Sequence, residues 1–194
     1  MGQYYKAIIL AEKSENSKSE FIRTWLDPLV YKNGSKLTEH AYIGNNFVAA
    51  VEAQISPDGM FYRSRLVWAG DYADPEPLGD NLNQSVPEPL GDNLTQARLT
   101  TDTTVATTVY RFIVNHSKRQ YVDKEKSTML HPLPLLTVEG NGRGGGDYHG
   151  PRQEDVGIWA RDVLSVELQA PGADYTEFLC GFAEPGSSSS NDYY

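Results

Sequence analysis

Short runs of aromatic and β-branched residues recur along this chain, and turn residues separate one run from the next. Such runs favour β-strands, because branched and ring side chains pack well on the pleated surface of a sheet. Turn signals such as Lys32-Asn33-Gly34-Ser35, where Asn-Gly suits a tight hairpin, keep each strand short. We expect strands at Tyr4–Leu10, Phe21–Leu26, Lys36–Ile43, Phe61–Trp68, Thr104–Asn115, Gln120–Val122, Leu133–Val138, Val156–Ala160, Val163–Leu168 and Tyr175–Phe182.

One segment has the spacing of a helix instead. Asn45 or Asn46 can cap its start, and Ser56-Pro57-Asp58-Gly59 ends it. Between them, apolar residues fall at i, i+1, i+4 and i+8, which is the pattern of a buried helical stripe: Phe47, Val48, Val51 and Ile55. The expected strands and this helix together predict an α+β fold that is mostly antiparallel sheet with one or two helices. Pro134 makes 133–138 an edge strand or a strand entry, because proline cannot donate into a central ladder.

The domain organisation follows from length and from a repeat. With 194 residues, 39% hydrophobic and 22% charged, the chain fits a single compact domain, which we place at 1–183, followed by a flexible Ser-rich tail at 184–194. A long loop at 71–98 carries a tandem duplication, in which residues 75–84 recur almost unchanged, 12 positions later, as 87–96. A surface loop tolerates such an insertion, since doubling its length adds only about 0.6 kcal/mol of closure entropy. One copy can dock on the fold while the other is spare.

Charge and targeting signals narrow the class of protein. Lys and Arg number 17 against 26 Asp and Glu, so the net charge is −9 and the pI is about 4.9. An acidic balance argues against general nucleic-acid binding, which normally needs a basic face. The apolar runs are too short for a membrane span, no export signal is seen, and the single cysteine, Cys180, suits a reducing compartment. We therefore expect a soluble cytoplasmic protein that does not act at a membrane, with Cys180 in its core.

The strongest local signal is a glycine-rich segment, Gly140–Gly150, with six glycines in eleven residues. Such a loop exposes consecutive backbone N–H groups that can bind an anionic small ligand, and an arginine within it can grip phosphate or carboxylate. The candidate ligand-binding residues here are Asn141, Gly142, Arg143, Gly144, Gly145, Asp147 and His149. A dinucleotide fold is not indicated, because Asp147–Pro151 offers no following helix. An irregular loop with Arg143 paired to an internal acid explains the same residues.

A second set of candidates follows the expected strand at 61–68. Asp71 and Asp74, with Trp68 just before them, join the ligand-binding set if the fold brings them to the glycine-rich loop. Together with Asp147, His149, Asp155 and Asp162 they suit a hard cation or general acid–base chemistry. The alternative is that the aspartates only form turns and that Trp68 is a core residue. His40, His116 and His131 have no zinc-ligand spacing, so we assign no metal site. The catalytic residues and any cofactor are unknown from the sequence.

Several motifs carry a family resemblance. Met1–Lys6, Val67–Asp74, Gly140–Asp147 and Val156–Ala160 resemble a family of uncharacterised microbial and viral proteins that open with Met-Gly-Gln-Tyr-Tyr. The resemblance covers most of the chain between residues 1 and 165. No activity is attached to that family, so the resemblance implies no mechanism.

Two functions are compatible with these observations. The first is a non-catalytic binding or assembly module, of the kind that viruses or mobile elements encode, which acts through a protein partner or its own copies. Negative charge, many aromatic residues and long loops favour it. The alternative is a Mg-dependent hydrolase or transferase that holds a phosphate ligand with the loop at 140–147. Whether the chain is an enzyme stays open at this point.

Overall fold

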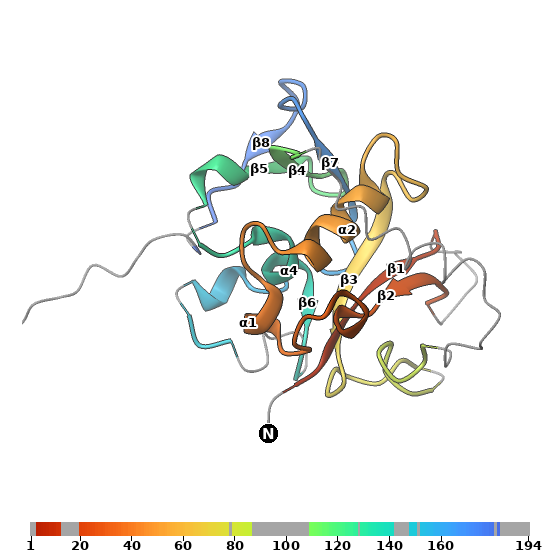
Figure 1. The fold of residues 1–194 in the computed structure, drawn as a ribbon. Helices are drawn as coiled ribbons and strands as arrows, with labels where there is room; N and C mark the ends of the chain where they lie inside the picture. Colours follow the sequence, from red (N-terminus) through yellow and green to blue (C-terminus); the bar gives the residue numbers. More distant parts are fainter. Residues whose placement is uncertain are drawn as a thin grey trace, which may run out of the picture.

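The strands form one mixed but mostly antiparallel sheet (Figure 1). The structure is a computed structural model that describes residues 3–12, 20–77, 79–86, 109–127, 129–141, 148–150, 152–180 and 182. The strands in these residues are β1 (Tyr5–Leu10), β2 (Ile22–Leu26), β3 (Ser64–Gly70), β4 (Phe112–Asn115), β5 (Gln120–Asp123), β6 (Val138–Glu139), β7 (Val163–Glu167) and β8 (Thr176–Glu177). Their order is β2-β1-β3-β7-β4-β5-β8, and β6 pairs with β3.

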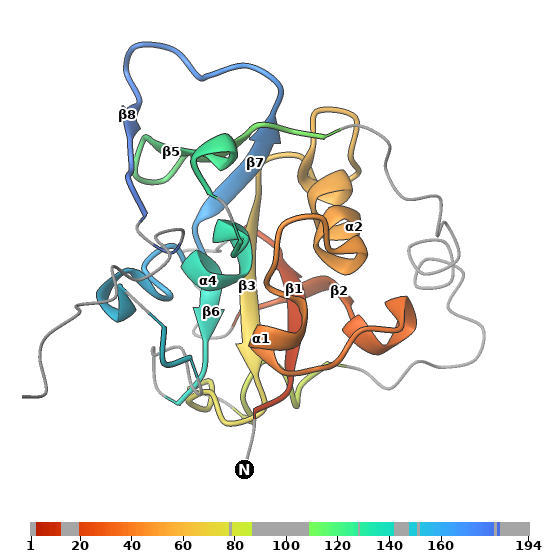
Figure 2. The same ribbon diagram turned by 60° about the vertical axis from the view of Figure 1, so that its left-hand side comes forward.

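Strand β3 is the centre of the sheet. It pairs antiparallel with β1 along one edge, and its other edge is shared by two strands. Near its start, Ser64 and Arg65 pair antiparallel with β7, whereas near its end Trp68 and Ala69 pair parallel with β6. Figure 2 shows β3 and β6 side by side, running the same way. Because the two strands are parallel, both end on the same side of the sheet, and the chain segments that follow β3 and β6 start there together.

Helices cover one face of this sheet. They are α1 (Leu37–His40), α2 (Asn46–Ile55) and α4 (Pro132–Thr137), with 3₁₀ turns η1 (Pro28–Tyr31), η2 (Lys124–Lys126) and η3 (Gln153–Asp155). The predicted helix at 45–55 is confirmed: the Asn45 side chain accepts from the amides of Phe47 and Val48, and the expected stripe is fully buried. The stripe lies with Leu66 and Trp68 of β3 in the main core.

The opposite face of the sheet carries a smaller core. Ile8 and Leu10 of β1, Trp25 of β2 and Val67 of β3 pack there with Leu82, which comes from the loop that follows β3. Leu82 is 2% exposed, so this loop segment is part of the folded domain. The α+β class and the single compact domain are as expected from the sequence. No helix in the described part of the chain is both long and apolar enough to cross a bilayer.

Two expected strands are helical instead. Residues 133–137 lie in α4, and only Val138 is in a strand, β6. The helix forms because His131 accepts the amide of Leu133 as N-cap and the prolines fall in the first turn, where their missing N–H groups cost nothing. Residues 37–40 form α1, where the Glu39 carboxylate accepts the Lys36 amide at 2.9 Å and caps the first turn. The described residues therefore hold three α-helices rather than one or two.

Three further expectations need correction. Residues 156–160 form turns rather than a strand, since Gly157 has φ of +76° and the amides of Gly157 and Trp159 donate to carbonyls of α4. The hairpin around Asn33-Gly34 is absent, because residues 32–36 join η1 to α1. Among the described residues of 175–182, only Thr176–Glu177 is a strand. The hairpin of β4 and β5 is confirmed, although 104–108 lie outside the described residues.

Candidate functional site

The acidic segment after β3 meets the start of the glycine-rich segment after β6. Ala73, between Asp71 and Asp74, forms an antiparallel bridge with Asn141. The meeting follows from topology, because parallel neighbours end at the same edge of a sheet. We call the residues 70–74 and 140–141 the β3–β6 corner. The candidates Gly142, Arg143, Gly144, Gly145 and Asp147 lie outside the described residues.

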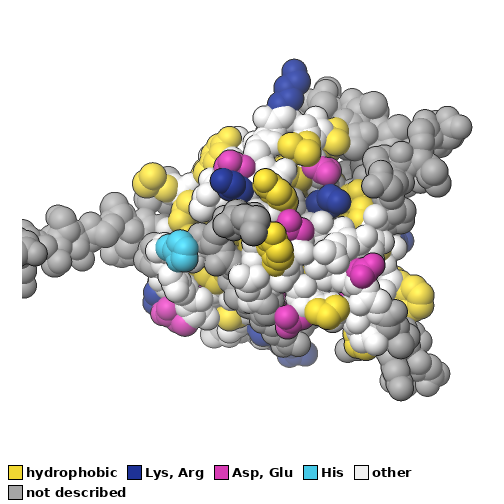
Figure 3. Space-filling model, turned by 90° about the horizontal axis from the view of Figure 1, so that it is seen from below, with side chains coloured by type: hydrophobic (Ala, Val, Ile, Leu, Met, Phe, Trp, Pro, Cys, Tyr) yellow, Lys and Arg dark blue, Asp and Glu magenta, His cyan; other side chains and the backbone are white. Residues whose placement is uncertain are grey.

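The two aspartates at the corner differ in their surroundings. An oxygen of the Asp71 carboxylate accepts the Tyr4 amide at 3.0 Å, and the Asp71 amide donates to the Tyr4 carbonyl at 3.0 Å, which extends the β1–β3 ladder by one pair. Asp74 is exposed at the surface. Figure 3 views this end of the molecule and shows acidic, basic and hydrophobic side chains interspersed rather than a patch of one sign. The Asp71 side chain thus has a structural use, whereas that of Asp74 faces solvent.

The first copy of the duplicated decapeptide docks beneath the corner. The Asn81 side-chain amide donates to the carbonyls of Asp71 and Ala73 at 2.9 and 3.1 Å. The Asn83 side-chain amide donates to the carbonyls of Tyr4 and Ala69 at 3.1 and 2.7 Å. The Tyr4 carbonyl also accepts the Asp71 amide, so the two asparagines add side-chain donors to main-chain carbonyls at the ends of β1 and β3 and in the corner.

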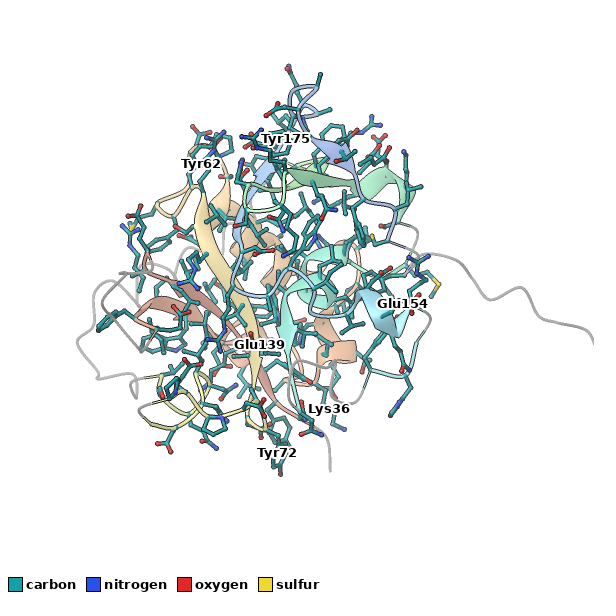
Figure 4. All side chains as sticks on the ribbon, turned by 180° about the vertical axis from the view of Figure 1, so that it is seen from behind. Lys36, Tyr62, Tyr72, Glu139, Glu154 and Tyr175 are labelled. Carbon is teal, nitrogen blue, oxygen red and sulfur yellow. The ribbon has the colours of Figure 1, made fainter. Side chains whose placement is uncertain are left out.

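An ion-pair cluster fixes the other end of the first copy. The Arg161 guanidinium donates to both carboxylate oxygens of Glu139 at 2.8 Å and to Glu76 of the first copy at 2.5 Å. Burial alone would lower the pKa of Arg161, but the hydrogen bonds to Glu139 and Glu76 raise it well above its ordinary value. Glu139 lies beside β3 in Figure 4. Nearby, Arg65 forms a bidentate pair with Glu20 at 2.6 and 2.7 Å.

The remaining candidates do not join the corner. Trp68 is fully buried in the main core, where its ring N–H donates to Nε2 of His40 at 2.8 Å and its ring lies 5.4 Å from that of Phe47. His149 is exposed, next to the buried Tyr148. Trp68 therefore supports the corner from inside the core and has no surface to offer a ligand.

The other acidic candidates have their own cations. Asp155 pairs with Arg152 at 2.9 Å, and Asp162 pairs with Lys118 and accepts from the Asn115 side chain at 2.8 Å. Within the described residues, no three His, Cys, Asp or Glu side chains are placed to hold a metal ion. Cys180 is partly buried, and burial raises the pKa of its thiol to about 11, which leaves it a poor nucleophile.

A chain of polar side chains that the sequence did not indicate lies at the opposite end of the sheet. The ring nitrogens of His116 lie 2.8 Å from the Tyr175 hydroxyl and 2.8 Å from Oγ of Ser165. Ser165 donates to Glu167 at 2.7 Å, and the Tyr62 hydroxyl donates to the same carboxylate oxygen at 2.9 Å. Figure 4 shows Tyr62 and Tyr175 at one end of the molecule and Tyr72 at the other.

This chain links four separate segments, which is why no local motif reveals it. Ser165 is fully buried and sits between His116 and Glu167, so its hydroxyl is committed on both sides. Burial, followed by the charge of Arg63, lowers the pKa of His116. A Ser-His-acid nucleophile needs the histidine between the acid and the serine. The order found here fits a structural network that ties β7 to β4 and β8.

A set of exposed apolar side chains lies on the helical side of the sheet. It consists of Leu29, Val30, Tyr42, Ile43 and Met129, whose exposed fractions range from 41% to 68%, and we call it the η1–α2 face. The amide of Ile43 donates to the Met129 carbonyl at 3.0 Å, and Tyr42 forms a bridge with Leu130. The Asn45 side chain donates to that of Asn33 at 2.7 Å, and this hydrogen bond connects the turn before α2 to the residues that follow η1.

Large exposed apolar side chains without charged residues among them are typical of the centre of protein interfaces. The segments 41–46 and 28–31 contain no Asp, Glu, Lys or Arg, although 22% of the chain is charged. Sequence reasoning missed this face, because Tyr42 and Ile43 were assigned to a strand. In comparisons with known proteins, no family model, no curated protein and no solved structure matches this chain.

Proposed function

We propose that this protein is a non-catalytic binding or assembly module that acts through protein–protein contacts on the η1–α2 face. The observation that carries the proposal is that five exposed apolar side chains come from three segments that hydrogen bonds and a β-bridge join, in an otherwise acidic protein. Tyr and Met are among the residues enriched at interface centres, and charged residues are depleted there. Because its single cysteine suits a reducing environment, we expect it to act in the cytoplasm.

The backbone beneath this face is held in place before any partner arrives. The Asn45 side chain caps α2, the ring of Tyr31 packs 5.6 Å from that of Phe47, and the 42–45 turn hydrogen-bonds to residues 129–130 and to Asn33. A preorganised surface loses little conformational entropy on binding. This favours recognition by a partner with a complementary apolar patch, either a second molecule of this chain or another protein.

Replacing Ile43 with aspartate is expected to abolish binding while leaving the fold intact, because the Ile43 side chain is exposed. Light scattering over a range of protein concentrations, at high salt to screen repulsion between acidic molecules, detects self-association. A photo-crosslinking residue at position 42 detects another protein in cells. Leu168, which directly follows β7 and is 58% exposed, provides the control position for both experiments.

A concentration-dependent mass that Ile43→Asp removes and Leu168→Asp retains would identify self-assembly. A discrete crosslinked species from position 42, absent from position 168, would identify a partner. Equal crosslinking from both positions, together with a monomeric mass at every concentration, would contradict the proposal.

We propose a second candidate function, a Mg-dependent hydrolase or transferase for a phosphate ligand, on the basis of the β3–β6 corner. The bridge between Ala73 and Asn141 brings Asp71 and Asp74 to the start of the segment that carries Arg143. Carboxylates beside a glycine-rich, arginine-bearing segment suit a phosphate with its magnesium ion.

Magnesium with a nucleotide is expected to raise the melting temperature if this second candidate is right, because ligands stabilise the folded state that binds them. Arg143→Ala should remove the shift. Arg119→Ala, an exposed arginine on the β4–β5 turn, is the matched control and should retain it. No shift with phosphate, nucleotide or Mg²⁺, or a shift that Arg143→Ala leaves intact, would contradict the candidate.

A further inference from the structure

The docking site of the first copy has two potential occupants in the same chain. We propose that the second copy of the duplicated segment, 87–96, binds the site that 75–84 occupies in this structure, so that the chain exchanges between two registers that differ by 12 residues. The proposal is independent of the proposed function, because it rests on how the first copy docks and on the sequence of the second.

The second copy repeats the docking residues. Glu88 matches Glu76, which pairs with Arg161, and Asn93 matches Asn81, which donates to two carbonyls. Leu94 matches Leu82, the side chain buried in the smaller core. The difference falls on Asn83, where the second copy has Thr95.

The residues that contact the first copy all lie outside the two duplicated segments. The acceptors are main-chain carbonyls of Tyr4, Ala69, Asp71 and Ala73, which are the same whichever asparagine donates. The apolar surface comes from strands β1, β2 and β3, and the cation is Arg161. The site is therefore complete for either copy.

The length of the loop permits the exchange. With the second copy docked, residues 97–108 connect it to Val109, and these 12 residues reach about 40 Å when extended. A 194-residue domain has a radius of gyration of roughly 16 Å, so the connection spans the domain. The 12 residues that are displaced on the other side lengthen a surface loop, which changes its closure entropy only slightly.

The first copy is expected to bind the docking site more tightly than the second copy. The Asn83 side chain donates two hydrogen bonds, to Tyr4 and Ala69, whereas the hydroxyl of Thr95 can donate only one. The second register is therefore the minor one in the native sequence, and it becomes the major one when the first copy is damaged.

The exchange occurs within one molecule rather than between two. Each chain has two copies of the segment but one site, so a second copy that docked on another molecule would displace the first copy there. The number of docked segments would not rise, and association would still cost translational and rotational entropy. The duplication consequently protects this edge of the sheet without linking molecules.

Three variants test the exchange by thermal unfolding: Leu82→Asp, Leu94→Asp and the double variant. The second copy should replace a damaged first copy, so Leu82→Asp should lower the melting temperature only slightly. Leu94→Asp alone, the matched control, should leave it unchanged. The double variant has no intact copy and should melt roughly 5–10 °C below Leu82→Asp.

A rescue variant tests the same exchange from the other side. Thr95→Asn restores the missing donor, so it should raise the melting temperature of Leu82→Asp and have no such effect when Leu94→Asp is also present. The proposal is overturned if Leu82→Asp alone melts as low as the double variant or fails to fold. It is also overturned if the melting temperature of Leu82→Asp changes with protein concentration, since this indicates exchange between molecules.

Discussion

Replacing Glu52 with alanine is expected to lower the free energy of unfolding by about 3–5 kcal/mol, because it leaves a buried cation without its partner. Glu52 on α2 pairs with Lys124, which begins η2, and all but about 9% of each side chain is buried. The same carboxylate oxygen lies 3.3 Å from Nε2 of His131, the N-cap of α4. Urea denaturation measures the loss.

The charge state of this cluster follows from its hydrogen bonds. Nδ1 of His131 accepts the Leu133 amide at 3.2 Å, so a neutral ring carries its proton on Nε2 and donates toward Glu52. Burial alone would raise the pKa of Glu52, but the neighbouring His131 and Lys124 lower it. The carboxylate is therefore ionised and balances the Lys124 ammonium.

Glu125→Ala is the matched control for Glu52→Ala. Glu125 also pairs with a cation, Arg111, at 2.7 Å, but it is 66% exposed, so its removal should cost less than about 1 kcal/mol. The double variant Glu52→Leu/Lys124→Met should recover most of the loss, since it removes both charges together. Similar costs for Glu52→Ala and Glu125→Ala would contradict this interpretation of the cluster.

Local sequence patterns predicted the elements whose cause is local. Helix α2 follows from an asparagine cap and an apolar stripe within eleven residues, and the β4–β5 hairpin follows from two adjacent strands. The helical conformation of 133–137 was missed because proline was interpreted only as a residue that limits strands. Its favourable place in the first turn depends on His131, a cap that the sequence alone does not distinguish from a scattered histidine.

The candidate site depends on pairs that are far apart in the sequence. Nothing near Asn141 indicates that β6, two residues long, pairs parallel with the end of β3 and so brings it to Ala73. The same holds for His116, whose partners Ser165 and Tyr175 come from other strands and turns. The duplication could be interpreted from the sequence, because two nearly identical segments suggest that one docks and the other is spare. The first copy is docked through Asn81, Leu82 and Asn83.

The protein is expected to lose stability steeply as the pH falls below about 6.5, because it folds around histidines held neutral. Burial lowers the pKa of His40, His116 and His131 from the ordinary value of 6.5. In His40 the geometry explains why: Nε2 accepts the Trp68 ring N–H at 2.8 Å, while Nδ1 lies 3.0 Å from the Gly34 carbonyl. A proton on Nε2 would point at the proton of Trp68.

The direction of this change in stability with pH follows from the difference in proton binding between the folded and unfolded protein. Below pH 6.5 the unfolded chain binds protons that the folded protein does not yet bind, so the free energy of unfolding decreases as the pH falls. Each histidine contributes about 1.4 kcal/mol per pH unit between its unfolded and folded pKa values, and three together give up to about 4 kcal/mol per unit. Above pH 6.5 this contribution to stability is fully present.

Urea denaturation at a series of pH values between about 7 and 5 measures this slope, and calorimetry in buffers of different ionisation enthalpy counts the protons taken up on unfolding. His40→Gln should reduce the proton uptake by about one, because it removes one of the three neutral rings. His149→Gln, which replaces an exposed histidine, is the matched control variant. A free energy of unfolding that is flat over this pH range would mean that the buried rings bind protons as readily in the folded protein as in the unfolded chain.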